Sequence, residues 1–325
     1  MTVTSAPAGG FPSQPELEAR HCLANSRFAE IDSVRIHYVD EGQGPAIVLL
    51  HGSYASLRQW DDWAEGLTAD HRVLRFDMPA TGLSGPASDY GAEAKLSLIR
   101  GLTALLGIDH FLLVATSSAG VAGAAFAAAC PERLSGLILN NIGVGPVQHD
   151  AGRMSPAFRA ALAVDALHPH WHEEELWRQV MLANYADPTR LSDAVVTRWT
   201  ELNNRQFPEA MRPDPVKVEA EFARTPDDLA RIAVPTLVLW SDRDPEVPLE
   251  REGRLALALL ATPDKQLVVI PDAGHMMPEE CGARGLAHAL PFIRRCATGA
   301  SRVHCAVSDV KNAANIDAAP DGGRT

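Results

Sequence analysis

Short apolar runs alternate along this chain with longer segments of helical periodicity, and this rhythm restricts the fold more than any other feature. The runs are Val34–Val39, Ala46–Leu50, Arg72–Phe76, His110–Ala115, Leu134–Leu139, Val234–Trp240 and Gln266–Ile270. The helical segments between them include Ser56–Leu67, Ala92–Leu106, Ala119–Cys130 and Arg251–Leu260. Runs that are apolar throughout, rather than at every second residue, indicate strands buried on both faces of a parallel sheet. The sequence therefore predicts an open, doubly wound α/β fold.

The rhythm stops between residues 145 and 225, where no such run occurs. This segment is rich in tryptophan and methionine and is divided by prolines, so we expect several short helices that form a lid at one end of the sheet. The α/β core then comprises residues 20–144 and 226–297. Residues 1–19 and 298–325 are rich in small and polar residues, and we expect both to be disordered tails.

The charge balance excludes some classes of partner. The 29 Lys and Arg residues stand against 41 Asp and Glu residues, which gives a formal net charge of −12 and argues against nucleic-acid binding. No apolar stretch reaches the roughly 20 residues of a membrane span, and the N-terminus lacks the pattern of a secretory signal. The five cysteines are scattered, which favours reduced thiols. We expect a cytoplasmic protein that acts on a small molecule, and the sequence leaves its oligomeric state open, a homodimer included.

A serine follows one of the predicted strands. In open α/β sheets, ligands bind at the carboxyl ends of the strands. Ser117 lies there, with the small residues Ala115 and Ala119 two positions before and after it, as a nucleophile on a tight strand-to-helix turn requires. Centring the turn on Ser118 would put β-branched Thr116 at a crowded position, so Ser117 is favoured. The alternative is that this serine only caps the following helix.

A histidine and an aspartate follow two later strands. A serine hydroxyl needs a base near pH 7, and the base needs a carboxylate that holds its tautomer. His275 follows the last strand, and Asp244 follows the strand before it, with Asp242 as a nearby rival. We therefore predict that Ser117, His275 and Asp244 meet at one edge of the sheet.

The chain resembles the α/β-hydrolase superfamily over residues 28–296, in the branch that holds esterases, carbon–carbon hydrolases, epoxide hydrolases and haloalkane dehalogenases. The matching motifs are His51-Gly52-Ser53, the stretch 76–84 (FDMPATGLS), Ser117 fourteen residues before Pro131-Glu-Arg133, Asp244 four residues before Pro248, and Gly274-His275. The resemblance implies a mostly parallel, eight-stranded sheet with a helical lid after the sixth strand. It also implies an oxyanion hole formed by the backbone N–H groups of Ser53 and Ser118.

The chain departs from the family pattern at four positions. Alanine replaces the usual glycine at residues 80, 115 and 119, and Ser241 replaces the more frequent glycine before the acid. Family members that open epoxides or displace halide use an aspartate nucleophile, whereas this chain has Ser117, which favours acyl transfer. We predict a serine hydrolase without cofactor or metal that cleaves a small, mostly apolar ester or lactone through an acyl-enzyme. The alternatives are a carbon–carbon hydrolase of diketones with the same triad, and a ligand-binding protein with weak or no turnover.

Other polar motifs are assigned no chemistry. The tract His168-Pro-His170-Trp-His172 precedes three glutamates, and a helix start with an acidic first turn explains it better than a metal site. His51 is expected to be structural, and Asp77 to stabilise the loops around the site.

Overall fold

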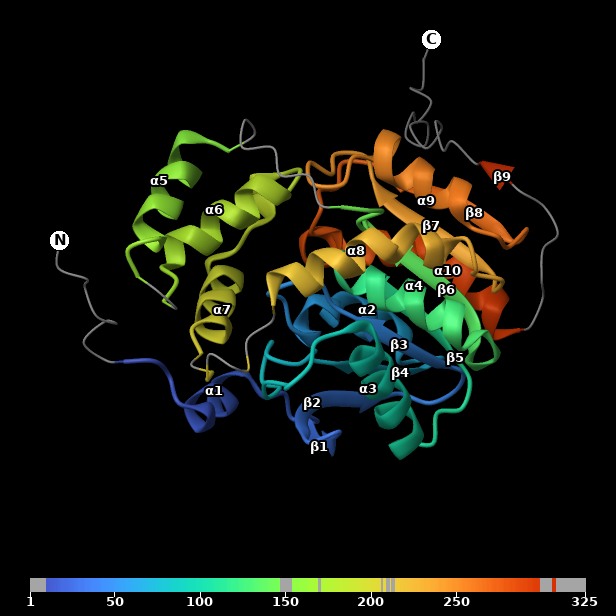
Figure 1. The fold of residues 1–325 in the computed structure, drawn as a ribbon, viewed down its shortest axis with the longest axis horizontal. Helices are drawn as coiled ribbons and strands as arrows, with labels where there is room; N and C mark the ends of the chain where they lie inside the picture. Colours follow the sequence, from blue (N-terminus) through green and yellow to red (C-terminus); the bar gives the residue numbers. More distant parts are fainter. Residues whose placement is uncertain are drawn as a thin grey trace, which may run out of the picture.

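A mostly parallel β-sheet forms the centre of the molecule (Figure 1). The computed structural model describes residues 10–146, 154–168, 171–205, 207–208, 211, 214–298 and 306–307. Its strands are β1 (Arg27–Ile31), β2 (Val34–Glu41), β3 (Ala46–Leu50), β4 (Arg72–Phe76), β5 (Phe111–Thr116), β6 (Leu134–Asn140), β7 (Thr236–Ser241), β8 (Lys265–Ile270) and β9 (Ala306–Val307).

The strand order is β1-β2-β4-β3-β5-β6-β7-β8-β9. The pairs β1–β2 and β2–β4 are antiparallel, and the pairs from β4–β3 onward are parallel. The predicted doubly wound fold with eight strands is confirmed by β1 to β8. The two-residue strand β9 extends the sheet at its edge. It lies within the segment 298–325, which was expected to be a disordered tail. From residue 299 onward, the rest of that segment is outside the described residues.

Helices cover both faces of the sheet and define two separate cores. On one face lie α3 (Ala92–Leu105), α4 (Ala119–Ala129) and α9 (Arg254–Leu259), and on the other lie α2 (Asp61–Leu67) and α10 (Met277–Ala297). Strand β3 shows the division: Val48 and Leu50 pack into the first core, whereas Ile47 and Leu49 pack into the second. Because both faces are buried, the strand is apolar at every position, as its sequence indicated.

A helical segment separates β6 from β7. It contains α5 (Pro156–Asp165), α6 (Glu174–Asn184), the 3₁₀ turn Pro188–Arg190, α7 (Asp193–Asn203) and α8 (Pro215–Leu229). Helices α5 to α7 stand beside the sheet, and α8 crosses back over it (Figure 1). Helix α8 runs across the predicted boundary at residue 225 and packs against α4 of the core.

The prediction of a disordered segment over residues 1–19 is wrong for its second half. Residues 14–21 form helix α1 (Gln14–His21), whose capping box joins Ser13 and Glu16. The pattern Ser13-x-x-Glu16 with Pro15 is a helix-start signal that was visible in the sequence. Helix α1 is held by burial of Leu17 beside Leu202 of α7. Residues 1–9 lie outside the described part.

Two further properties concern the described residues. Cys22, Cys130, Cys281 and Cys296 are free thiols. None of the helices in this part of the chain combines the length and apolar character needed to cross a bilayer.

Candidate active site

The three residues predicted to meet do lie together at the carboxyl edge of the sheet. Ser117 follows β5, Asp244 follows β7 and His275 follows β8. The Oγ of Ser117 is 2.9 Å from Nε2 of His275, and Nδ1 of His275 is 2.8 Å from Oδ2 of Asp244. Asp244 and His275 are both buried. A hydroxyl, an imidazole and a carboxylate are thus linked in series by two hydrogen bonds.

Ser117 occupies a strained turn between β5 and α4. Its φ of +52° lies in the left-handed region that L-residues avoid, which is a feature of functional turns. The methyl group of Ala115, where the family usually has glycine, fits here because residue 123 is itself glycine. A Cβ added to Gly123 would lie 2.7 Å from Cβ of Ala115, so the missing side chain of Gly123 makes room for the methyl group of Ala115. The hydroxyl of Ser117 faces His275, and the N-cap of α4 is Ser118, whose side chain makes no capping bond.

The loop that carries His275 is held from two sides. The Nδ2 of Asn141, at the end of β6, donates to the carbonyl oxygens of Gly274 and His275 at 3.3 and 3.1 Å. From the other side, Oε2 of Glu280 accepts from the N–H of Gly274 at 2.8 Å. Asn141 also donates to Oγ of Ser241 and accepts from its N–H, which joins the loop to the end of β7. The sequence analysis gave Asn141 no role, although its position at a strand end was a signal.

Gly274 allows this loop to approach the end of helix α6 closely. An added Cβ would lie 2.1 Å from the carbonyl oxygen of Asn184 and 2.7 Å from the backbone nitrogen of Ala186. Both obstacles are backbone, so the His275 loop would have to move.

We expect Gly274→Ala to lower kcat by about 10- to 100-fold, because displacements near 1 Å cost on the order of 10²-fold. Steady-state kinetics of the purified variants, on the substrate that the wild type turns over best, measure this. Gly85→Ala, whose Cβ would make only ordinary contacts from 3.6 Å, is the control. An unchanged kcat in Gly274→Ala would contradict the expectation.

Asp244 is fixed by its own loop. Its Oδ1 accepts from the backbone N–H groups of Glu246 and Val247 at 2.8 and 2.9 Å, which leaves Oδ2 for His275. The rival Asp242 is exposed, and its Oδ1 accepts from the N–H of Ala273 at 3.3 Å instead. The structure therefore places Asp244, not Asp242, beside the imidazole.

A second carboxylate also lies beside His275. The Oε2 of Glu246 is 3.2 Å from Nε2, the same nitrogen that faces Ser117. Burial lowers the pKa of His275, but the carboxylates of Asp244 and Glu246 together outweigh burial and raise that pKa to about 9. Sequence reasoning missed Glu246, although it stands only two residues after Asp244.

Ser53 and Ser118 lie next to each other beside Ser117. The hydroxyl of Ser53 donates to Oγ of Ser118 at 2.8 Å. Within the described ranges, the backbone N–H of neither serine donates to a protein acceptor. Two amides without protein acceptors beside a serine hydroxyl are available for a negatively charged oxygen.

A second Ser–His–Asp set exists elsewhere in the molecule. His37 lies 2.7 Å from Oδ2 of Asp77 through Nδ1 and 2.7 Å from Oγ of Ser26 through Nε2. Here the hydroxyl also accepts from the N–H of Leu23, and Asp77 also accepts from the N–H of Leu57, so all three side chains serve as connections between loops. Burial raises the pKa of Asp77, but the hydrogen bond from His37 and nearby charges hold that pKa below its ordinary value.

His51 is held by hydrogen bonds to backbone groups of neighbouring loops. It is buried, its Nδ1 lies 2.7 Å from the carbonyl of Gly52, and its Nε2 accepts from the N–H of Met78 at 3.0 Å. Burial lowers the pKa of His51, consistent with a neutral ring in this arrangement.

The histidine tract lies only partly within the described residues. Nδ1 of His172 lies 2.8 Å from Oδ1 of Asp165, and His170 is outside the described residues. Among the residues with described positions, no group of three His, Cys, Asp or Glu side chains is placed to hold a metal ion.

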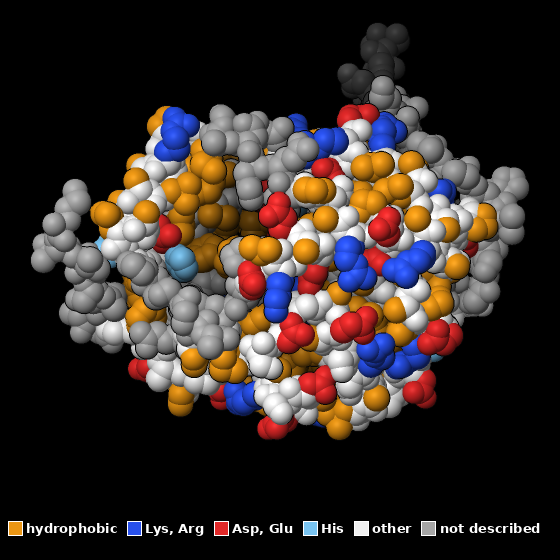
Figure 2. All heavy atoms as spheres, in the orientation of Figure 1, with side chains coloured by type: hydrophobic (Ala, Val, Ile, Leu, Met, Phe, Trp, Pro, Cys, Tyr) orange, Lys and Arg blue, Asp and Glu red, His pale blue; other side chains and the backbone are white. Residues whose placement is uncertain are grey.

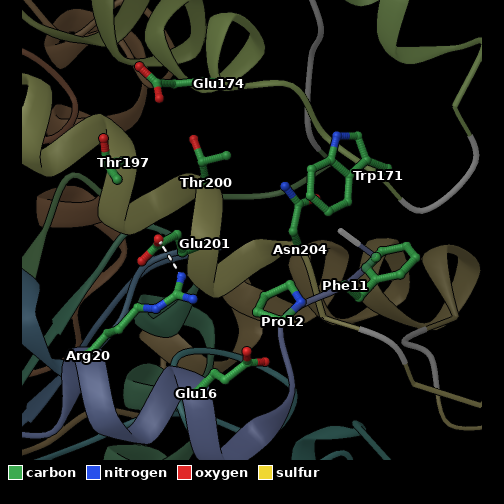
Figure 3. Close-up of a pocket in the computed structure, with 11 residues that line it drawn as sticks. Phe11, Pro12, Glu16, Arg20, Trp171, Glu174, Thr197, Thr200, Glu201 and Asn204 are labelled. Atoms are coloured by element: carbon green, nitrogen blue, oxygen red, sulfur yellow. Dashed lines mark hydrogen bonds and ion pairs between the residues drawn. The ribbon is translucent and has the colours of Figure 1, made fainter. Parts of the chain in front are cut away.

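A cavity of about 410 Å³ lies apart from the Ser117 site, between α1 and the α6–α7 region (Figure 3). Phe11, Pro12 and Trp171 form its apolar side. Two of its four charged residues, Arg20 and Glu201, face each other and form an ion pair at 2.8 Å. None of the three predicted catalytic residues lines this cavity.

Apolar side chains of α6 and α7 contact the site loops. Trp177, Met181 and Trp199 form a cluster with Met276, which follows His275, and with Ala55, which lies two residues after Ser53. The ring of Tyr54, 60% exposed, lies 5.3 Å from that of Trp177. Figure 2 shows a hollow between the α5–α6 pair and α8 whose walls are largely hydrophobic.

The sheet topology and the serine at its strand-to-helix turn define an α/β-type hydrolase. The chain belongs to the alpha/beta hydrolase family, whose model matches residues 47–289. A 2-hydroxy-6-oxononadienedioate/2-hydroxy-6-oxononatrienedioate hydrolase of Pseudomonas putida is 27% identical over 294 residues, which cover 83% of this chain and 94% of that protein.

Solved structures share the fold. A meta-cleavage product hydrolase from Pseudomonas fluorescens matches with a TM-score of 0.69 at 20% identity, over 83% of this chain and 97% of that chain. An esterase from Thermogutta terrifontis matches with a TM-score of 0.67 at 24% identity, over 84% of this chain and all of that chain. The family match and the hydrolases among its relatives identify the chain as a hydrolase.

Proposed function

We propose that this enzyme hydrolyses a carbon–carbon bond beside a ketone in an enol-diketone of the 2-hydroxy-6-oxo-dienoate type. The observation that carries the proposal is the series of hydrogen bonds from Ser117 through His275 to Asp244, in a chain whose relatives include hydrolases named for such compounds. This reverses the order of the sequence analysis, which put ester hydrolysis first.

In the proposed reaction the enol proton first moves to the carbon beside the ketone, which gives the diketone form, and the Ser117 hydroxyl then attacks the ketone carbon. His275 takes the hydroxyl proton, Asp244 stabilises the imidazolium, and the N–H groups of Ser53 and Ser118 bind the oxyanion. The bond to the neighbouring carbon then breaks. Its electron pair is delocalised toward the other carbonyl of the diketone form, and His275 returns the proton to the leaving fragment. Water, activated by His275, releases the acyl group from Ser117 and completes the hydrolysis.

The surroundings of the site favour an apolar group on the acyl side. Tyr54 and Met276, next to Ser53 and His275 in the chain, pack against apolar side chains of α6 and α7. The guanidinium groups of Arg178 and Arg190 in the inserted helices are engaged by carboxylates within the protein. We therefore propose that the ketone carries an aryl or alkyl group rather than a chain with a second carboxylate.

A substrate panel tests the proposal. It contains a 6-aryl 2-hydroxy-6-oxohexadienoate, the 6-oxononadienedioate analogue, and p-nitrophenyl esters of acetate and butyrate. We expect the largest kcat/KM on the aryl diketone, followed by the dioate and then the esters, with fragments of the diketone identified by mass spectrometry. Turnover of the esters without cleavage of either diketone would contradict the proposal and restore the ester or lactone hydrolase as the leading function, since the same three side chains cleave esters.

A further inference from the structure

Glu246 lies at the nitrogen through which His275 contacts the serine. Its Oε2 is 3.2 Å from Nε2, and Oγ of Ser117 is 2.9 Å from the same atom. In the series proposed above, Nε2 has to be unprotonated to accept the proton of Ser117. A carboxylate at this distance instead favours an Nε2 that carries a proton, because only the imidazolium forms an ion pair with it.

The side chain of Glu246 is free to change position. It is 53% exposed, whereas the side chain of Asp244 is completely buried. Asp244 is also held by two backbone N–H groups, one of them that of Glu246 itself. The loop after β7 thus supplies two carboxylates to one imidazole: a fixed one at Nδ1 and an adjustable one at Nε2.

We propose that Glu246 is a positioning residue that keeps a proton on Nε2 of His275 in the free enzyme, so that Ser117 gains its base only when this proton is lost. Deprotonation of the imidazolium releases one proton to solvent and leaves Nε2 with a lone pair. That lone pair then accepts the proton of Ser117 as Oγ attacks the substrate. Glu246 acts only through His275 and forms no bond to the substrate.

Asp244 also favours the imidazolium, but among the described charged groups near His275 it is Glu246 that lies at Nε2. Asp244 contacts the opposite nitrogen, and Asn141 contacts the backbone carbonyl of His275 with a neutral amide. Behind the loop, Glu280 accepts from the N–H of Gly274 and pairs with Arg190 at 2.8 Å. The two carboxylates that raise the pKa of His275 to about 9 against the effect of burial are Asp244 and Glu246.

The inference rests on the proposed role of Ser117, so its test uses a probe that needs only an activated serine. The rate of labelling by an uncharged fluorophosphonate is measured from pH 5 to 10 for the wild type, Glu246→Gln and Glu246→Asp. We expect the Glu246→Gln midpoint to lie about one pH unit or more below that of the wild type, since an adjacent charge moves a pKa by about 1–3. At pH 6 to 7 this variant should label about tenfold faster or more.

Two control variants test whether the charge of Glu246 causes the shift of the labelling midpoint. Glu250→Gln removes a carboxylate from the helical turn Leu249–Gly253, which follows this loop. Glu250 pairs with Arg254 at 2.6 Å rather than with His275, and we expect the wild-type midpoint. Glu246→Asp keeps the charge and should stay closer to the wild type than Glu246→Gln does. A Glu246→Gln midpoint equal to that of the wild type, with labelling intact, overturns the role of Glu246 alone. If the wild type is labelled at no pH, the proposed function of Ser117 fails with it.

Discussion

Ser117→Ala is expected to lower kcat by on the order of 10⁵- to 10⁶-fold on whichever substrate the wild type turns over. The variant lacks Oγ, the proposed nucleophile, which lies 2.9 Å from Nε2 of His275. No acyl-enzyme is therefore expected to form. The residue is small and sits at a turn whose backbone conformation is equally strained for alanine, so the fold and thermal stability should be retained. Steady-state kinetics and the mass of the protein after fluorophosphonate treatment measure the loss.

The second Ser–His–Asp set provides a matched control. Ser26 contacts His37, which contacts Asp77, at distances similar to those around Ser117. Ser26→Ala removes a hydroxyl with the same kind of neighbours, yet we expect it to keep the wild-type kcat and to alter only stability. If Ser117→Ala retains turnover and Ser26→Ala loses it, the assignment of the nucleophile is wrong.

The central sheet was predictable because a strand that is buried on both faces is apolar at every position, and this pattern is visible in the sequence. Strand β3 is apolar at all five positions, and its bounds match the predicted run. Strand β1 (Arg27–Ile31) lacks this pattern, because it is an edge strand with polar residues and mixed exposure. It was not predicted. Helix α1 was missed although its capping box can be read from the sequence, because the segment around it is rich in small and polar residues and the contact with α7 that holds it is distant in sequence.

The site was predictable as far as strand ends determine it. Ser117, Asp244 and His275 each follow a strand, and adjacent parallel strands bring their carboxyl ends to one edge. The direction of a loop side chain is not determined in this way. Glu246 turns back toward His275 because the loop curls around Asp244, whose Oδ1 accepts from two successive N–H groups. Asn141 likewise reaches the His275 loop from the end of β6, across the intervening strand β7, a contact that strand assignment alone does not give.

Asp244→Asn is expected to lower kcat by about 10⁴-fold with little change in the fold. Oδ1 of Asp244 accepts hydrogen bonds from two backbone N–H groups. The asparagine amide would therefore place its oxygen there and its NH₂ group toward Nδ1 of His275. Nδ1 would then accept rather than donate, and the remaining proton would sit on Nε2, facing Ser117. The imidazole would be held in the tautomer that is unable to accept the serine proton, and the imidazolium would lose its buried counter-charge.

Asp242→Asn separates this effect from a general loss of loop charge. Asp242 is exposed two residues earlier and accepts only from the N–H of Ala273, so its variant should keep kcat within about threefold, as is usual for a surface substitution. Kinetics on the best substrate of the panel, with thermal melting of both variants, measure the contrast. Equal losses in the two variants would mean that the loop, rather than the carboxylate at Nδ1, supports turnover. A large loss confined to Asp244→Asn would instead tie the activity to the tautomer of His275, because only this variant changes what Nδ1 meets.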